Sequence, residues 1–127
     1  MELVAIVTAL ALLQVFVFSF QAGQARIKTG INAPAMSGAP EFERASRVHL
    51  NTIEQLIILI PSMWMFANYV RADIAAGLGI VFIVGRQIYR SAYLQDPGKR
   101  TVGFSVGALA MMVLLVGGLV GAVMRLL

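Results

Sequence analysis

The 127-residue chain has no cysteine and only one histidine, His49. Without cysteine it can form no disulfide, offer no thiolate to a metal and use no thiol of its own as a nucleophile. A single imidazole also falls short of the ligand set of a usual transition-metal centre. We therefore expect no metal site in this protein.

Charged residues are scarce as well. They make up 13% of the chain, whereas hydrophobic residues make up 59%. Soluble domains contain about 25% charged and about 45–50% apolar residues, so this composition is typical of a membrane protein. Residues 3–20 and 102–124 are strongly apolar, and residues 44–69 and 73–93 are each apolar at one end and polar at the other. Because about 20 residues of helix span a bilayer, we predict an all-α integral membrane protein built as a four-transmembrane-helix bundle.

These four segments occupy nearly the whole chain, which predicts a single domain over residues 1–127. The first segment follows Glu2 rather than a basic residue, and its apolar run exceeds the core of a signal peptide, so we expect a retained helix. Residues 30–40 (GINAPAMSGAP) should be irregular, and residues 96–99 (DPGK) should form a turn. Asp73 is a candidate cap for the third helix.

The net charge of +4 is unevenly distributed. With four spans, the first and third loops share one side of the membrane, and the second loop and both termini share the other. Eight of the ten Lys and Arg residues fall near the first side, and only Arg71 and Arg125 near the second. The positive-inside rule then predicts cytoplasmic first and third loops and external termini, in the inner membrane if the chain is bacterial. The basic excess thus indicates topology, or partly a surface for anionic membrane lipid, and no nucleic-acid partner.

Polar residues interrupt the second segment at helical spacing. Arg47, Asn51 and Glu54 follow the i, i+4, i+7 pattern of one helix face, and His49 points elsewhere. In the third segment the same kind of face is formed by Arg86, Tyr89 and Tyr93, with Arg90 beside them. Two further arginines end the first segment and open the fourth on the same side: Arg26 and Arg100.

Two interpretations of these polar faces remain open. Terminal arginines often snorkel and interfacial tyrosines often form an aromatic belt, so each residue alone favours a structural role. Together they favour a pocket, because one central charge costs about 2.5–3.5 kcal/mol on insertion scales. Arginine offers paired donors to carboxylates, Glu54 can accept an ammonium and Asn51 can do both. Such a pocket would suit a small zwitterion with more carboxylates than amines.

The polar stretch EFERASRVHLNTIEQ, residues 41–55, resembles the signature of the MAPEG family, the membrane-associated proteins in eicosanoid and glutathione metabolism. The family pattern has F-E-R, then Arg, Asn and Glu after three, four and three further residues. The matching residues here are Phe42, Glu43, Arg44, Arg47, Asn51 and Glu54. The stretch GRQIYRSAYLQDPGKR, residues 85–100, resembles a second block of the leukotriene-C synthase branch, matched by Arg86, Tyr89, Tyr93 and Arg100.

This resemblance implies a homotrimer of four-helix subunits that binds glutathione, as a co-substrate, between neighbouring subunits near the cytoplasmic face. It implies that Arg100 is the catalytic residue, which donates to the glutathione sulfur and stabilises the thiolate. It implies that the second substrate, a lipophilic electrophile, arrives laterally from membrane lipid. The implied glutathione-binding residues are Arg26, Arg47, Asn51, Glu54, Tyr89 and Tyr93, and the implied supporting residues are Arg86, His49 and Gln55.

The chain also departs from the eicosanoid-making branch. Gln55 stands where that branch usually has Tyr, His49 stands where it tends to have Gln, and Pro61 lies seven residues after Glu54 rather than three. These differences favour a bacterial relative with general glutathione-transferase or lipid-hydroperoxide peroxidase activity. Two alternatives are a non-catalytic lipid-binding scaffold, as in the lipoxygenase-activating branch, and a small four-helix transporter. The first would lack much of the glutathione constellation, and the second would place polar groups at the membrane midplane.

Overall fold

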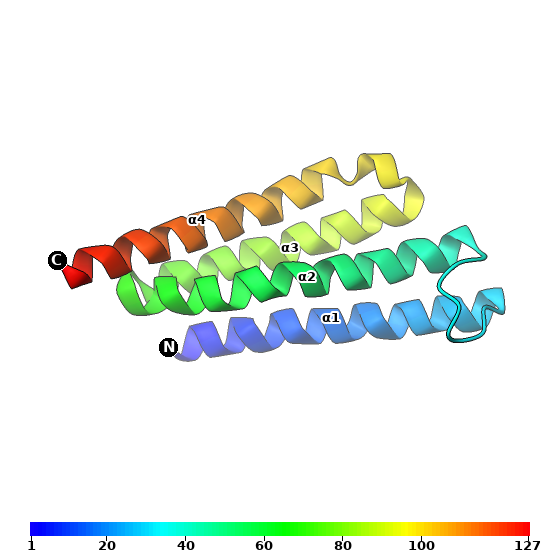
Figure 1. Ribbon diagram of the computed structural model, residues 1–127, viewed down its shortest axis with the longest axis horizontal. Helices are drawn as coiled ribbons and strands as arrows, with labels where there is room; N and C mark the ends of the chain where they lie inside the picture. Colours follow the sequence, from blue (N-terminus) through cyan, green and yellow to red (C-terminus); the bar gives the residue numbers. More distant parts are fainter.

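The computed structural model describes residues 1–127 and contains helices but no strands. The helices are α1 (Glu2–Thr29), α2 (Pro40–Tyr69), α3 (Ala72–Gln95), the short 3-10 helix η1 (Pro97–Lys99) and α4 (Thr101–Leu126). The four α-helices are long and apolar enough to cross a membrane, which confirms the predicted all-α, four-span fold. They run side by side, with both termini at one end of the molecule and the α1–α2 and α3–α4 connections at the other (Figure 1). We call this second end the loop end.

The helices extend beyond the apolar segments that predicted them. Helix α1 continues past residue 20 to Thr29, and it ends at Gly30, whose left-handed φ of 73° suits glycine. The following residues are irregular, as predicted, until Pro40 starts α2 at a position where proline loses no helical hydrogen bond. At 24 to 30 residues each, the four helices exceed the length needed for the hydrocarbon core, so their polar ends project from it.

The two remaining local predictions have different outcomes. The predicted turn at residues 96–99 is confirmed, because Asp96 accepts the Gly98 N–H at 3.0 Å and starts η1. The predicted cap at Asp73 is wrong, since the N-cap of α3 is Arg71. Asp73 lies in the first turn instead, where its carboxylate accepts from Arg71 at 2.8 Å and from the Ile74 N–H at 2.9 Å. The neighbouring guanidinium holds this carboxylate beside the helix start.

The core of the bundle is apolar, and so is much of its outer surface. Leu59, Met63, Phe82 and Leu114 are completely or almost completely buried between the helices. Large apolar side chains on the outer faces stay exposed, with Phe16 at 70%. In water such a surface would be unusual. In a membrane it is expected, because apolar side chains on the outer faces of the helices contact lipid instead of water.

Glycines bring α4 close to its neighbours. A Cβ added at Gly103 would lie 2.6 Å from Cα of Tyr89 and 2.7 Å from the Gly85 carbonyl oxygen, so the α3 and α4 backbones touch here. Farther along α4, Gly117 packs against the Phe66 ring of α2, and a Cβ at Gly121 would lie 2.9 Å from the Tyr69 carbonyl oxygen. Small residues spaced four apart, as Gly103 and Gly107 or Gly117 and Gly121 are, commonly allow membrane helices to approach closely.

We predict that Gly103→Ala lowers the stability of the bundle by about 1–3 kcal/mol, because the added methyl group meets backbone that cannot move aside. Gly77→Ala is the matched control on α3, since nothing lies within 4 Å of its Cβ position. Thermal unfolding in detergent measures both variants. Equal midpoints for the two variants would show that the α3–α4 contact is not tight.

Candidate functional site

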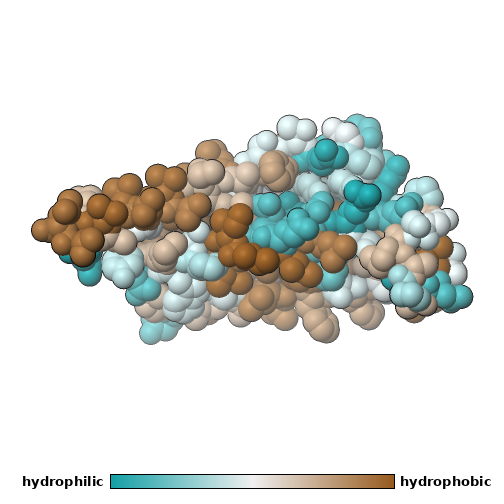
Figure 2. Space-filling model, in the orientation of Figure 1, coloured by the Kyte–Doolittle hydropathy of each residue, from teal (hydrophilic) through white to brown (hydrophobic).

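A polar cavity of about 570 Å³ lies near the loop end of the bundle. Hydrophilic surface gathers on this half of the molecule, whereas the end that carries the C terminus is hydrophobic (Figure 2). Residues of α2, α3 and the start of α4 line the cavity: Arg47, Asn51, Glu54, Gln55, Arg86, Tyr89, Tyr93, Arg100, Thr101 and Phe104. They include every residue that the sequence singled out for a site except Arg26 and His49.

Arg86 forms the buried wall of this cavity. Its side chain is only 1% exposed, and its Nε and Nη2 donate to the Thr52 hydroxyl at 3.2 and 3.0 Å. The same hydroxyl donates to the Val48 carbonyl at 2.7 Å, so it serves as donor and acceptor at once. No carboxylate lies within ion-pair distance of the guanidinium. A buried charge without a counter-ion favours an anion in the adjoining cavity.

Two stacked tyrosines continue this wall along α3. The guanidinium carbon of Arg86 lies 3.9 Å from the centre of the Tyr89 ring, and the rings of Tyr89 and Tyr93 are 5.4 Å apart. Asn51 of α2 donates from Nδ2 to the Tyr89 hydroxyl at 2.9 Å. The cation under the ring and the amide at the hydroxyl fix Tyr89 from two directions, so the wall is preorganised before any ligand binds.

The rim of the cavity carries exposed charges. Arg47 and Glu54 point out of the same face of α2, both are exposed, and neither forms an ion pair within the chain. A second hollow of about 430 Å³ shares Arg47, Asn51 and Glu54 and continues toward the α1–α2 loop. The polar face of α2 formed by Arg47, Asn51 and Glu54 therefore lies between two hollows. Its cation and its carboxylate are both available to a ligand.

Arg100 stands at the opposite rim, at the start of α4. The turn that begins at Asp96 places it there, and its side chain makes one long hydrogen bond, 3.4 Å from Nη1 to the Pro97 carbonyl. The guanidinium is exposed and otherwise free. Phe104, one turn farther along α4 and 45% exposed, adds an apolar surface beside it. A cation and an apolar surface thus meet at one edge of the cavity.

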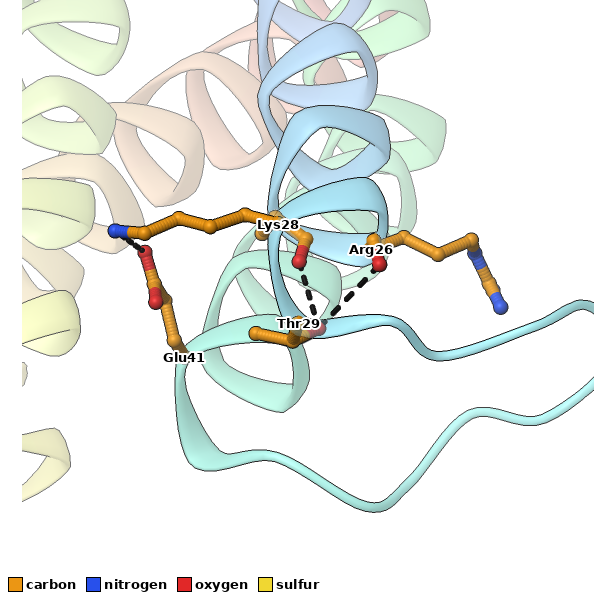
Figure 3. Close-up of polar contacts among 5 residues, drawn as sticks. Arg26, Lys28, Thr29 and Glu41 are labelled. Carbon is orange, nitrogen blue, oxygen red and sulfur yellow. Dashed lines mark hydrogen bonds and ion pairs between the residues drawn. The ribbon is translucent and has the colours of Figure 1, made fainter.

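Arg26 lies outside this cavity within the single chain. Its Nη1 donates to the Ala35 carbonyl at 2.8 Å, and its guanidinium lies 4.4 Å from the centre of the Phe42 ring. It therefore braces the α1–α2 loop. The side chain points away from the Lys28–Glu41 pair on the other side of α1 (Figure 3). His49, on α2, is partly buried and also lies outside the cavity.

The sequence placed Arg90 beside the Arg86–Tyr89–Tyr93 face, and in the structure it lies outside the cavity that this face lines. Arg90 faces α1, where its guanidinium carbon lies 5.9 Å from the centre of the Phe18 ring. It lines a different cavity, described below. Arg90 points about 100° away from Tyr89 but only about 40° from Arg86, so it lies at the edge of this face, on the side where α1 packs.

Three residues of the site were missed in the sequence. Thr101 and Phe104 line the cavity, and Thr52 holds Arg86 from across the helix pair. Phe104 could have been found from its i, i+4 register with Arg100 on one face of a helix. Thr52 gave no signal, because a threonine among apolar residues commonly bonds its own helix backbone.

Comparison with known proteins finds a family match for this chain. The MAPEG family model matches residues 4–120, from α1 into α4. An uncharacterized protein of Synechocystis sp. is 43% identical over 96% of this chain and 89% of that protein. Human microsomal glutathione S-transferase 2 is 40% identical over 89% of this chain and 78% of that protein. Leukotriene C4 synthase of Cavia porcellus is 31% identical over 89% of this chain and 75% of that protein.

We predict that Thr52→Val destabilises the protein by at least about 1–3 kcal/mol, because it leaves the buried Arg86 guanidinium without its acceptor. Thr52→Ser keeps the hydroxyl and loses only a methyl group, so a smaller loss of about 1 kcal/mol is expected. Thermal unfolding in detergent compares the two. If the valine variant is as stable as the serine variant, the hydrogen bonds to Arg86 do not hold this wall.

Proposed function

Because this chain belongs to the MAPEG family, we propose that it is a membrane glutathione transferase that conjugates glutathione to lipophilic electrophiles. Reduction of lipid hydroperoxides would be a second reaction of the same bound thiolate. The chain is an integral multi-pass membrane protein by its fold and its family. One relative is named as a microsomal glutathione S-transferase and another as a leukotriene C4 synthase. Both names support a glutathione-dependent enzyme.

One observation carries the proposal. Side chains from α2, from α3 and from the N-cap of α4 that match the two family blocks line one cavity. Glutathione has two carboxylates and one ammonium group. Arg47 is free to pair with a carboxylate, and Glu54 is free to accept the ammonium. Asn51, Tyr89 and Tyr93 supply the remaining polar contacts along the peptide.

Arg100 supplies the chemistry in this proposal. A thiol with a pKa of about 8.5 is only a few per cent ionised at neutral pH, and the thiolate is the reactive form. Lowering that pKa by about two units requires about 2.7 kcal/mol of differential stabilisation. A guanidinium aimed at the sulfur in a partly dehydrated site can provide this, and it keeps its own proton. The exposed, weakly held side chain of Arg100 can reach such a position.

The reaction itself needs little else. The thiol proton leaves to solvent, the sulfur attacks the electrophilic carbon, a carbon–sulfur bond forms and a leaving group such as chloride departs with its electron pair. The apolar surface of Phe104 lies next to Arg100 and borders the lipid side of the cavity. A lipophilic substrate dissolved in the bilayer would approach the thiolate there.

Assembly and orientation complete the proposal. The cavity is open along its rim in one chain, and Arg26 contacts the α1–α2 loop instead of the cavity. A homotrimer would close the rim with a neighbouring copy and would let Arg26 reach a peptide bound between subunits. The loop end, near which most basic residues lie, faces the cytoplasm in this arrangement, and both termini face the outside. Residues 1–127 then act as one four-helix unit.

We predict that Arg100→Ala lowers the rate of glutathione conjugation to a chlorinated nitrobenzene by roughly 10²–10³-fold, the usual effect of removing one aimed donor. The ultraviolet absorbance of bound thiolate should disappear at neutral pH, while binding of glutathione measured by calorimetry changes little. Lys99→Ala is the matched control, because Lys99 is an exposed neighbouring cation outside the cavity. Equal activity in the two variants would remove Arg100 from the mechanism.

A further inference from the structure

A second polar cavity, of about 310 Å³, lies near the loop end on another face of α3. Gln21, Gln24 and Lys28 of α1, Glu41 of α2 and Arg90 of α3 supply its polar lining, and the rest is apolar. It shares no residue with the cavity assigned to glutathione. The side chains of α3 therefore separate two basic cavities.

Arg90 is the unneutralised charge of this second cavity. It makes no hydrogen bond and no ion pair in the chain, and its nearest aromatic contact is the Phe18 ring at 5.9 Å. It precedes Gln95, the last residue of α3, by five positions, which is about 7.5 Å along a helix. The headgroup layer is about 5–7 Å thick on each side of the hydrocarbon core, so a helix that ends at the membrane surface would place Arg90 at the level of the headgroups.

Gln21 lines the same cavity, and its side chain carries an unpaired acceptor. Its Oε1 is buried and has no hydrogen-bond partner. Gln21 lies two turns before the end of α1 and so deeper than Lys28, which lies in the last turn. A buried carbonyl oxygen without a donor is unfavourable, so a ligand that brings a donor group would be stabilised there.

An ion pair stands at the mouth of the cavity. Nζ of Lys28 lies 3.0 Å from Oε1 of Glu41, and both side chains are largely exposed (Figure 3). The charges that face the cavity are therefore two cations, Lys28 and Arg90, and one carboxylate, Glu41. Their sum leaves one positive charge, so the cavity suits a ligand with one negative charge.

We propose that this cavity binds the headgroup of an anionic phospholipid that carries a hydroxyl group, of the phosphatidylglycerol type. The phosphodiester accepts hydrogen bonds from Arg90, and a glycerol hydroxyl donates to Oε1 of Gln21 once the amide turns toward the cavity. Ala25, Ala45 and Leu94 line the apolar part, where the lipid's glycerol backbone packs. The depth of Arg90 and this apolar lining favour a lipid over a soluble anion. The site goes beyond the proposed enzyme function and does not depend on it.

The test is a titration of purified protein in zwitterionic detergent, read by native mass spectrometry. Four probes separate the contributions: phosphatidylglycerol, phosphatidylmethanol with the same charge and no hydroxyl, zwitterionic phosphatidylcholine, and inorganic phosphate. We expect affinity in this order for the lipids, with roughly tenfold between phosphatidylglycerol and phosphatidylcholine, or about 1.4 kcal/mol. Inorganic phosphate should neither bind nor compete at millimolar concentration.

Three variants assign the effect to residues. Arg90→Gln should lose the preference for anionic lipid, and Arg90→Lys should keep most of it because the charge remains. Gln21→Leu should bind phosphatidylglycerol only as well as phosphatidylmethanol. Lys99→Gln removes an exposed cation elsewhere near the loop end and should bind as the wild type does.

Three results would overturn the proposal. Unchanged lipid binding in Arg90→Gln would exclude this cavity as the site. Equal binding of the two anionic lipids by the wild type would exclude the hydroxyl contact with Gln21. Competition by inorganic phosphate would identify a free anion in place of a lipid. Glutathione conjugation by each variant reports that it is folded, and it is expected to stay at the wild-type rate.

Discussion

A guanidinium group held inside a bundle of membrane helices is the interaction on which the rest of this site depends. Arg86 is 1% exposed, and its partners are one threonine hydroxyl and the face of one tyrosine ring. None of these partners neutralises its charge. The field of the cation is therefore directed into the cavity beside it, where an anionic ligand would supply the missing negative charge. Tyr89, held by the same cation and by Asn51, gives that cavity a fixed wall.

The packing of α4 against α3 determines the position of the second cation, Arg100. Backbone contact at Gly103 holds the start of α4 against Tyr89 of α3. Arg100, three residues earlier, is therefore kept at the rim of the same cavity. A larger residue at Gly103 would move the cation away from the wall that it faces. Stability and the proposed chemistry thus depend on the same small residue. The arginine side chain can stay loosely held because its backbone is fixed.

Much of this arrangement could be predicted from the sequence, because the signals are the length of the apolar runs and the helical spacing of the polar residues. Apolar runs long enough to cross a bilayer gave the four helices, and the spacing of Arg47, Asn51 and Glu54 gave the face of α2 that lines the cavity. The parts that failed depend on neighbouring helices or on loop geometry. Whether Arg90 joins the cavity or turns toward α1 depends on how α1 packs against α3, which helical spacing alone does not show. The role of Thr52 depends on α3, and the contacts of Arg26 depend on the path of the α1–α2 loop.

The central claim is that groups from three helices hold one peptide with its sulfur at Arg100. A cryo-electron microscopy structure in lipid nanodiscs with saturating glutathione tests it most directly. The account predicts density for the peptide against Arg47, Tyr89 and Tyr93, with its sulfur at hydrogen-bond distance, about 3 Å, from the Arg100 guanidinium. Density for the peptide in another place, or an Arg100 side chain turned toward the lipid headgroups with the cavity empty, would contradict it.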